Sequence, residues 1–124
     1  MTQKNIKTGS CLCGEVAYET IGDLSKIIAC HCIQCRKTTG HFLASTAVGL
    51  KNFKLTREQG LKWYRSSEIA RRGFCSSCGS TLFWQADDGD HIAIAAGTID
   101  GGTGLQIDKH IFCDFAGDYY KIEE

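Results

Sequence analysis

The sequence predicts a mainly β protein built from short strands in one domain. Its 124 residues suffice for a single domain. Short segments rich in strand-forming residues follow one another closely, with turn-forming residues between them. A helical hydrophobic period is hard to sustain anywhere beyond about two turns. Together these observations favour a sandwich, a barrel or a tent-like arrangement of strands.

The expected strands can be placed in order along the chain. Residues 1–8 are expected to form a loose tail. Glu15–Thr20 alternates in character and consists largely of strand formers. Ile27–Ala29 leads directly into a group of cysteines. The remaining predicted strands are Phe42–Val48, Phe53–Leu55, Leu61–Arg65, Glu68–Phe74, Thr81–Trp84, His91–Ala95 and one or two within Leu105–Phe115.

Two connections and one helical turn complete this prediction. Asp87-Asp88-Gly89-Asp90 has the composition of a hairpin connection, so its carboxylates are expected to serve the turn. Asp100–Gly104 is a loop by its composition. Ile33–Thr39 is expected to form one short turn of helix.

Composition excludes several classes of protein. Fourteen basic residues balance fourteen acidic ones, which argues against a generic binder of nucleic acid or anionic membranes. The longest purely apolar run, Ile92–Ala96, is too short to span a bilayer. The first seven residues lack the apolar core of a secretory signal. Eight cysteines without such a signal predict a cytoplasmic protein with metal thiolates instead of disulfides.

Seven of the eight cysteines fall into three tight groups. Thiols two or three residues apart across a tight turn can share one metal ion. A glycine after the second thiol permits the positive φ that such turns often need. The two cysteine pairs that are followed by a glycine therefore look like the knuckles of a zinc ribbon. The three groups are Cys11-Leu12-Cys13 before Gly14, Cys75-Ser76-Ser77-Cys78 before Gly79, and Cys30-His31-Cys32-Ile33-Gln34-Cys35.

Counting ligands divides these thiols between two zinc ions. Zinc takes four protein ligands in structural sites, and three plus an open position in catalytic sites. The closed structural site is expected to consist of Cys11, Cys13, Cys75 and Cys78. The catalytic site is expected to consist of Cys30, Cys32 and Cys35. This second zinc would be the one more easily lost, because an open thiolate site is exposed to oxidation. Spacing alone does not say which pairs meet.

Each assignment has an alternative. The four cysteines of the first site can instead be buried, inert thiols or disulfides. The second site is closed and structural if a fourth ligand comes from Cys113, His31, His41 or His110. His31 stands between two proposed ligands, so its side chain is expected to point away from the ion. Cys113 follows Ile111 and Phe112 and is expected to be a small buried hydrophobe.

The motifs resemble those of the glutathione-dependent formaldehyde-activating enzyme family, which includes the centromere protein V-like domains. The matching stretches are Gly9–Val16, Cys30–Lys37 with Gly40, Arg72–Ser80, Leu82-Phe83 and His110–Phe112. They occur in the family's order, and the resemblance extends over about residues 8–122. It implies a single β-tent domain of short antiparallel strands with two zinc ions per chain. The tyrosines Tyr119-Tyr120 stand where the family commonly has a tryptophan.

The resemblance also implies a function and assigns the cysteines as the count does. It makes Cys11, Cys13, Cys75 and Cys78 the structural ligands, and Cys30, Cys32 and Cys35 the catalytic ones. The implied activity is that of a carbon–sulfur lyase, which joins glutathione and formaldehyde to S-hydroxymethylglutathione. The implied partner is a small-molecule thiol such as glutathione, with no nucleic acid and no membrane.

Basic residues and histidines are candidates for supporting roles. Seven thiolates and two zinc ions together add three negative charges, which calls for nearby positive charge. Arg36-Lys37 and Arg71-Arg72 flank cysteine groups. They can pair with the carboxylates of glutathione, support the sulfurs, or lie on a solvated face. Candidate proton carriers, each equally an ordinary core or surface histidine, are His31, His41 and His110.

A different class of function remains open, a non-enzymatic zinc-binding module in which both metals are structural and the exposed loops bind a protein partner. Trp63-Tyr64 and Phe83-Trp84 would then form an exposed aromatic patch, whereas core packing is the ordinary role of such residues. The two hypotheses differ in whether the second metal has a free position.

Overall fold

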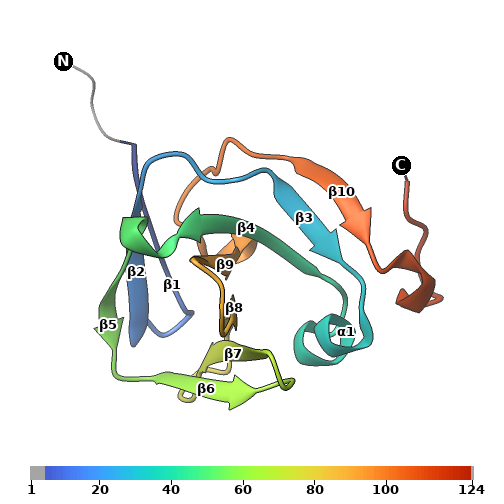
Figure 1. Cartoon of the computed structure of the whole chain (residues 1–124), viewed down its shortest axis with the longest axis horizontal. Coiled ribbons are helices and arrows are strands. Elements are labelled where there is room, and N and C mark those ends of the chain that lie inside the picture. Colours follow the sequence, from blue (N-terminus) through green and yellow to red (C-terminus); the bar gives the residue numbers. More distant parts are fainter. Residues whose placement is uncertain (1–4, 124) are drawn as a thin grey trace.

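Short strands make up most of the secondary structure, so the mainly β prediction is confirmed. The structure is a computed structural model that describes residues 5–123. Its strands form one sheet of three and one sheet of seven (Figure 1). The strands predicted from Leu61–Arg65 and His91–Ala95 have the bounds that were expected, and most others differ by one to three residues at an end.

The smaller sheet has the order β1-β2-β5 and is antiparallel. Its strands are β1 (Ile6–Ser10), β2 (Val16–Ile21) and β5 (Phe53–Glu58). The prediction of a loose tail over residues 1–8 is wrong for residues 6–8, which belong to β1. They are ordered because β1 pairs with β2 from Ile6 opposite Ile21 to Ser10 opposite Ala17. Residues 1–4 lie outside the described part of the chain.

The larger sheet has the order β10-β3-β4-β9-β8-β7-β6. Every pair in it is antiparallel except β10 with β3, so the prediction of antiparallel strands is wrong for this one pair. The pairing is parallel because β10 begins beside the start of β3, where Ile107 pairs with Ile27 and the N–H of Ile27 donates to the carbonyl of Gln106. The strands are β3 (Ile27–Cys30), β4 (Leu43–Gly49), β6 (Leu61–Arg65), β7 (Ala70–Cys75), β8 (Thr81–Ala86), β9 (His91–Ala95) and β10 (Ile107–Ile111).

The core lies between the small sheet and the middle of the large one. Tyr18 of β2 packs edge-on against Phe83 of β8, with ring centroids 5.6 Å apart. Trp63 packs against this core from β6, while Tyr64 is 61% exposed. The predicted alternative of an exposed aromatic patch is therefore wrong for Phe83, which is core. Other buried members are Val16, Val48, Leu82, Ile92, Ile94 and Ile99.

One α-helix is present in residues 5–123, and it has the bounds that the sequence predicts. This helix, α1 (Ile33–Thr39), begins at Cys32 as N-cap and ends at Gly40. It lies on the side of the molecule away from the small sheet, below β3 and β10 in Figure 1. No described helix is long and apolar enough to cross a membrane. Three single-turn 3-10 helices complete the secondary structure: η1 (Leu50–Asn52), η2 (Ala96–Thr98) and η3 (Cys113–Phe115).

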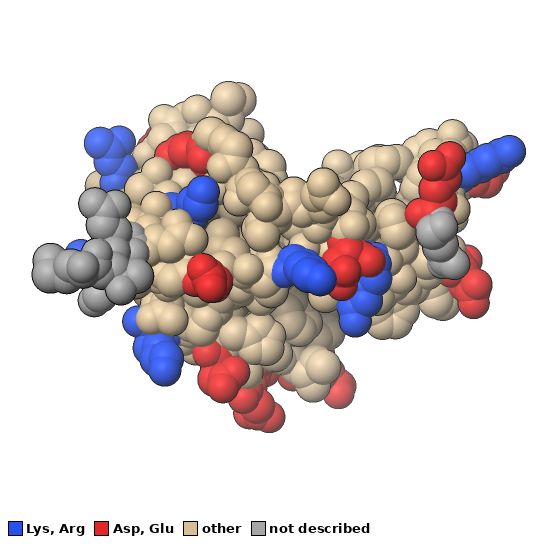
Figure 2. Space-filling model, turned by 90° about the horizontal axis from the view of Figure 1, so that it is seen from above, with Lys and Arg blue, Asp and Glu red and all other residues tan. Residues whose placement is uncertain are grey.

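Charged side chains of both signs are mixed on the face shown in Figure 2. Two exposed ion pairs occur over the described surface as a whole: Arg65 with Asp87 at 2.8 Å, and Nζ of Lys26 with Oδ1 of Asp108 at 3.8 Å. Such exposed pairs contribute about 1 kcal/mol or less each to stability.

Candidate metal centres

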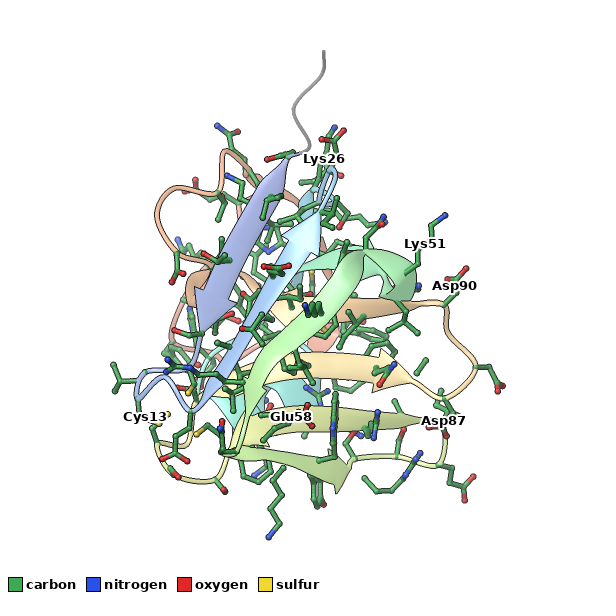
Figure 3. The ribbon with its side chains drawn as sticks, turned by 90° about the vertical axis from the view of Figure 1, so that its left-hand side faces the viewer. Cys13, Lys26, Lys51, Glu58, Asp87 and Asp90 are labelled. Atoms are coloured by element: carbon green, nitrogen blue, oxygen red, sulfur yellow. The ribbon has the colours of Figure 1, made fainter. Side chains whose placement is uncertain are left out.

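The first candidate centre brings together the two cysteine pairs that the sequence predicts to be zinc knuckles. The loop between β1 and β2 supplies one pair of thiols, and the end of β7 with the turn that follows it supplies the other. All four sulfurs lie within 4.8 Å of one another. Figure 3 shows Cys13 at the lower end of the small sheet, away from Asp87 and Asp90 on the β8–β9 connection. The four residues are Cys11, Cys13, Cys75 and Cys78.

Tight turns hold each pair of thiols. The N–H of Gly14 donates to the carbonyl of Cys11 at 3.2 Å, and the N–H of Gly79 donates to that of Cys75 at 2.7 Å. Both glycines have positive φ, 84° and 81°. The expectation that glycine serves such a turn after each pair is confirmed. A side chain at either position would strain the backbone that aims the sulfurs.

Two hydrogen bonds that involve side chains tie the two knuckles to each other. The N–H of Leu12 donates to the hydroxyl of Ser80 at 3.1 Å. The hydroxyl of Ser77 donates to the carboxylate of Glu15 at 2.9 Å. Residues more than sixty positions apart in the chain are therefore held in register by contacts besides the sulfurs.

The sulfur spacing fits a tetrahedral metal ion. A zinc–sulfur distance of about 2.3 Å places the sulfurs of a tetrahedron about 3.8 Å apart. The sulfur of Cys13 lies 3.7 Å from that of Cys11 and 3.7 Å from that of Cys75. All eight cysteines are free, so the alternative of disulfides is wrong. This cluster can hold a metal ion.

Local hydrogen bonds favour the anionic form of one of these thiols. The hydroxyl of Ser80, which lies 3.2 Å from the sulfur, lowers the pKa of Cys78 to about 5, and backbone N–H groups assist. A thiolate at neutral pH is the form that binds metal. The turn therefore favours metal binding through its own polar groups.

Gly60 makes the close approach of the β5–β6 turn to the first cluster possible. A Cβ at this position would lie 2.8 Å from the sulfur of Cys75 and 3.1 Å from Cβ of Glu15. We expect Gly60→Ala to destabilise the fold by about 1–3 kcal/mol, as overpacking does, and to weaken metal retention. Denaturant unfolding and chelator-induced metal release measure the two effects. Gly97→Ala is the control, because nothing lies within 4 Å of its Cβ position; equal behaviour of the two variants would contradict the prediction.

The second candidate centre lies at the junction of β3 and α1. Cys30 ends β3, Cys32 is the N-cap of α1, and Cys35 is buried in its first turn. Their three sulfurs lie within 4.8 Å of one another. A hydrogen bond from Cys35 lowers the pKa of Cys30 to about 6, with help from the N–H of Cys32. The cluster thus combines metal-binding spacing with a thiol that ionises readily.

Within residues 5–123 this cluster acquires no fourth protein ligand. Neither a histidine nor Cys113 lies within 4.8 Å of all three sulfurs. Cys113 is partly buried in η3, so it is less enclosed than expected. The three thiols can hold a metal ion, and the described residues bring no fourth histidine, cysteine or carboxylate ligand to it.

His31 points away from the sulfurs into a network of its own, as expected. It is fully buried, and its ring bonds the hydroxyl of Tyr120 through Nδ1 and Nδ1 of His110 through Nε2. Burial lowers the pKa of His31, and the nearby His110 and His41 lower it further. A neutral imidazole has one donor and one acceptor, which matches two partners. Tyr120 therefore anchors the C-terminal segment to His31, which lies between β3 and α1.

Loss of the Tyr120 hydroxyl would leave a buried ring nitrogen without a partner. We expect Tyr120→Phe to destabilise the protein by about 1–3 kcal/mol. The matched control is Tyr119→Phe, whose hydroxyl meets His41 at an exposed position and whose loss is expected to cost about 0.5 kcal/mol or less. Denaturant unfolding of both variants checks this difference. Equal stabilities would show that His31 does not depend on Tyr120.

The basic residues near the cysteines have different roles. Arg36 donates to the carbonyl of Phe115 at 2.9 Å, and Lys37 is exposed. Arg71 lies over the ring of Trp63, 3.8 Å from its centroid, and Arg72 donates to the sulfur of Cys35. Support of sulfur, one of the three expected roles, is thus found for Arg72.

Sequence reasoning missed two residues of this region. Gln34 accepts a hydrogen bond from Arg72 and donates to the carbonyl of Ser66, so it links α1 to the loop after β6. Its position inside the three-cysteine motif was the available signal. Tyr120 was noticed only as a departure from a family pattern, and nothing local predicts that it contacts His31.

A cavity of about 300 Å³ lies beside the second cluster. Arg72 lines it and also touches Cys35, and Thr38 lines it from one helical turn beyond Cys35. The remaining lining consists of Tyr64, Gly73, Phe74, Gly79 and Thr81. None of the three cysteines lines the cavity, so Arg72 and Thr38 are the residues that connect it to the second cluster.

Together, these observations define a small, mainly β protein with two cysteine clusters that can hold metal ions. A family model described as glutathione-dependent formaldehyde-activating enzyme matches residues 6–115. The chain belongs to this family, and the resemblance seen in its motifs is confirmed.

Individual proteins are also similar to this chain. An uncharacterized lyase of Schizosaccharomyces pombe is 28% identical over 116 residues, which cover 92% of this chain and 83% of that protein. A crystal structure of a Rhodobacter sphaeroides protein matches with a TM-score of 0.65 and 22% identity, over 83% of this chain and 98% of that one. This second similarity shows the fold alone.

Proposed function

We propose that the protein is a zinc-dependent carbon–sulfur lyase-type enzyme that acts on a thiol and a small aldehyde. Glutathione and formaldehyde are the substrates that its family's description suggests, which would make it S-(hydroxymethyl)glutathione synthase-like. The name of its Schizosaccharomyces pombe relative, a lyase, points to the same class of enzyme. The observation that carries the proposal is the cluster of three thiols without a fourth ligand among the described residues.

The thiol donors suit zinc in both clusters. In this proposal Cys11, Cys13, Cys75 and Cys78 hold a structural zinc, and Cys30, Cys32 and Cys35 hold a catalytic one. When bound, the second zinc lowers the pKa of a coordinated substrate thiol, so that the thiol is held as a thiolate near neutral pH. Three anionic sulfurs from the chain would make the bound zinc a weak Lewis acid, which favours delivery of a thiolate over activation of water.

The chain's residues would orient the substrate around this position. The carbon–sulfur bond forms between the thiol sulfur and the aldehyde carbon, and the thiol's proton ends on the aldehyde oxygen. Cys30, at the end of β3, and Cys35, in α1, fix the sulfurs on two rigid elements. The cavity beside Arg72 receives the remainder of the thiol substrate.

Metal-edge absorption spectroscopy with and without glutathione tests this proposal. We expect about two zinc ions per chain, one with four protein sulfurs and one with three that gains a further sulfur from glutathione. An assay of thiol–aldehyde addition follows the same samples. Four protein ligands at both ions, together with no added activity, would favour the non-enzymatic zinc module.

A further inference from the structure

Arg72 is a buried cation that no carboxylate neutralises in the described part of the chain. It lies in β7, and only 7% of the residue is exposed. Ion pairs among residues 5–123 involve Lys26, Arg65 and His91, and Arg72 takes part in none of them. A buried charge without a counter-charge is strongly unfavourable. An anion of another kind must therefore lie beside it.

The group beside the guanidinium is the sulfur of Cys35, which supplies a negative charge when it holds a metal ion as a thiolate. Nη1 and Nη2 of Arg72 lie 3.7 and 3.6 Å from it, and Nη2 also donates to Oε1 of Gln34 at 3.3 Å. Nε is buried and has no protein partner. Both ends of the guanidinium fork meet one sulfur while Nε stays unbonded. The guanidinium is therefore oriented toward the sulfur, although this orientation leaves Nε without a hydrogen bond.

The net charge of the metal-loaded second cluster decides which kind of fourth ligand the nearby Arg72 favours. Three thiolates around a divalent metal carry one net negative charge, and a substrate thiolate would add another. A buried guanidinium offsets one of these charges at a place where solvent screens weakly. A neutral fourth ligand adds no charge and gains much less from the same cation.

We infer that Arg72 is a positioning residue that lets the second cluster bind an anionic sulfur as its fourth ligand in preference to a neutral ligand. The inference rests on the proposed function, because it requires a fourth ligand from outside the chain. Arg71 provides the contrast on the same strand. Its guanidinium stacks on Trp63 and donates to Gln85 instead of a sulfur.

Cobalt(II) substituted for zinc tests the inference without an activity assay, because its visible absorption reports the ligands of each cluster. The cobalt-loaded protein is titrated with 2-mercaptoethanol and, separately, with imidazole. We expect Arg72→Gln to lower the ratio of thiol affinity to imidazole affinity by about tenfold. Arg72→Lys keeps the charge and is expected to recover most of the ratio. Arg71→Gln is expected to leave it unchanged.

The outcomes separate this inference from the proposed function. An unchanged ratio in Arg72→Gln, or an equal loss in Arg71→Gln, overturns the inference and leaves the proposed function intact. If Arg72→Gln does not fold, Arg72→Lys decides alone, because a wild-type ratio supports a role of charge and a tenfold loss overturns it. If neither probe changes the spectrum of the wild-type protein, the proposed function and the inference both fail.

Discussion

Cys78→Ser is expected to leave little folded, soluble protein. Structural zinc supplies about 10–16 kcal/mol of apparent binding free energy in small domains, whereas a whole domain is stable by only about 5–15 kcal/mol. Cys78 is partly exposed, so serine leaves no cavity that would explain a loss of this size. The sulfur lies in the cluster where the β7–β8 turn meets the β1–β2 loop, and the described side chains add two hydrogen bonds between these turns. Soluble yield, metal content and thermal unfolding measure the effect.

Cys113→Ser is the matched control for this loss. It makes the same chemical change at a cysteine outside both candidate centres. We expect it to retain about two metal ions per chain and a nearly unchanged melting temperature. If Cys78→Ser melts like Cys113→Ser, the four-cysteine cluster does not hold a structural metal.

Cys32→Ser is expected to abolish thiol–aldehyde activity while the fold survives. The side chain of Cys32 accepts a hydrogen bond from the N–H of Cys35 as the N-cap of α1. Serine is among the preferred N-cap residues, so it keeps this cap and removes only the thiolate. We expect the metal content to fall from about two ions to about one, and the rate to fall to that of the uncatalysed reaction. Metal analysis, circular dichroism and the addition assay measure these three properties.

Two other results for Cys32→Ser would each contradict this prediction. Retention of both ions and of full activity would remove Cys32 from the second centre. Unfolding as severe as that of Cys78→Ser would make both centres structural, and the enzyme hypothesis would lose its basis. Cys113→Ser again serves as the control, since it should keep both activity and metal.

Local properties of the chain predicted much of the fold. Alternating polarity and strand-forming residues predicted the strands β2 to β9, because a half-buried strand places apolar and polar side chains on opposite faces. The helical turn Ile33–Thr39 was predicted with its exact bounds, because its cap and its stop are local residues. β1 escaped prediction since it is short and Gly9 is its one buried residue, and its order comes from pairing with β2. The parallel pairing of β10 with β3 has no local signal at all.

The candidate sites divide in the same way. The knuckle turns could be predicted because a glycine with positive φ after each thiol pair is a local requirement, met at Gly14 and Gly79. Ligand counting grouped the cysteines as the structure does in space, although their role as metal ligands stays a prediction. That Cys13 and Cys75 lie 3.7 Å apart, 62 residues from each other, depends on the packing of two sheets.

By itself the sequence determined the class of fold, the family and the thiols available to metal, because spacing, turn residues and strand patterns are properties of neighbouring residues. Only the tertiary structure decided which side chains surround those thiols. It placed Arg72 instead of Arg71 or Arg36 on the sulfur of Cys35, and it joined His31 to Tyr120. These contacts link residues far apart in the chain, where burial and partner geometry select among side chains whose local sequences look alike.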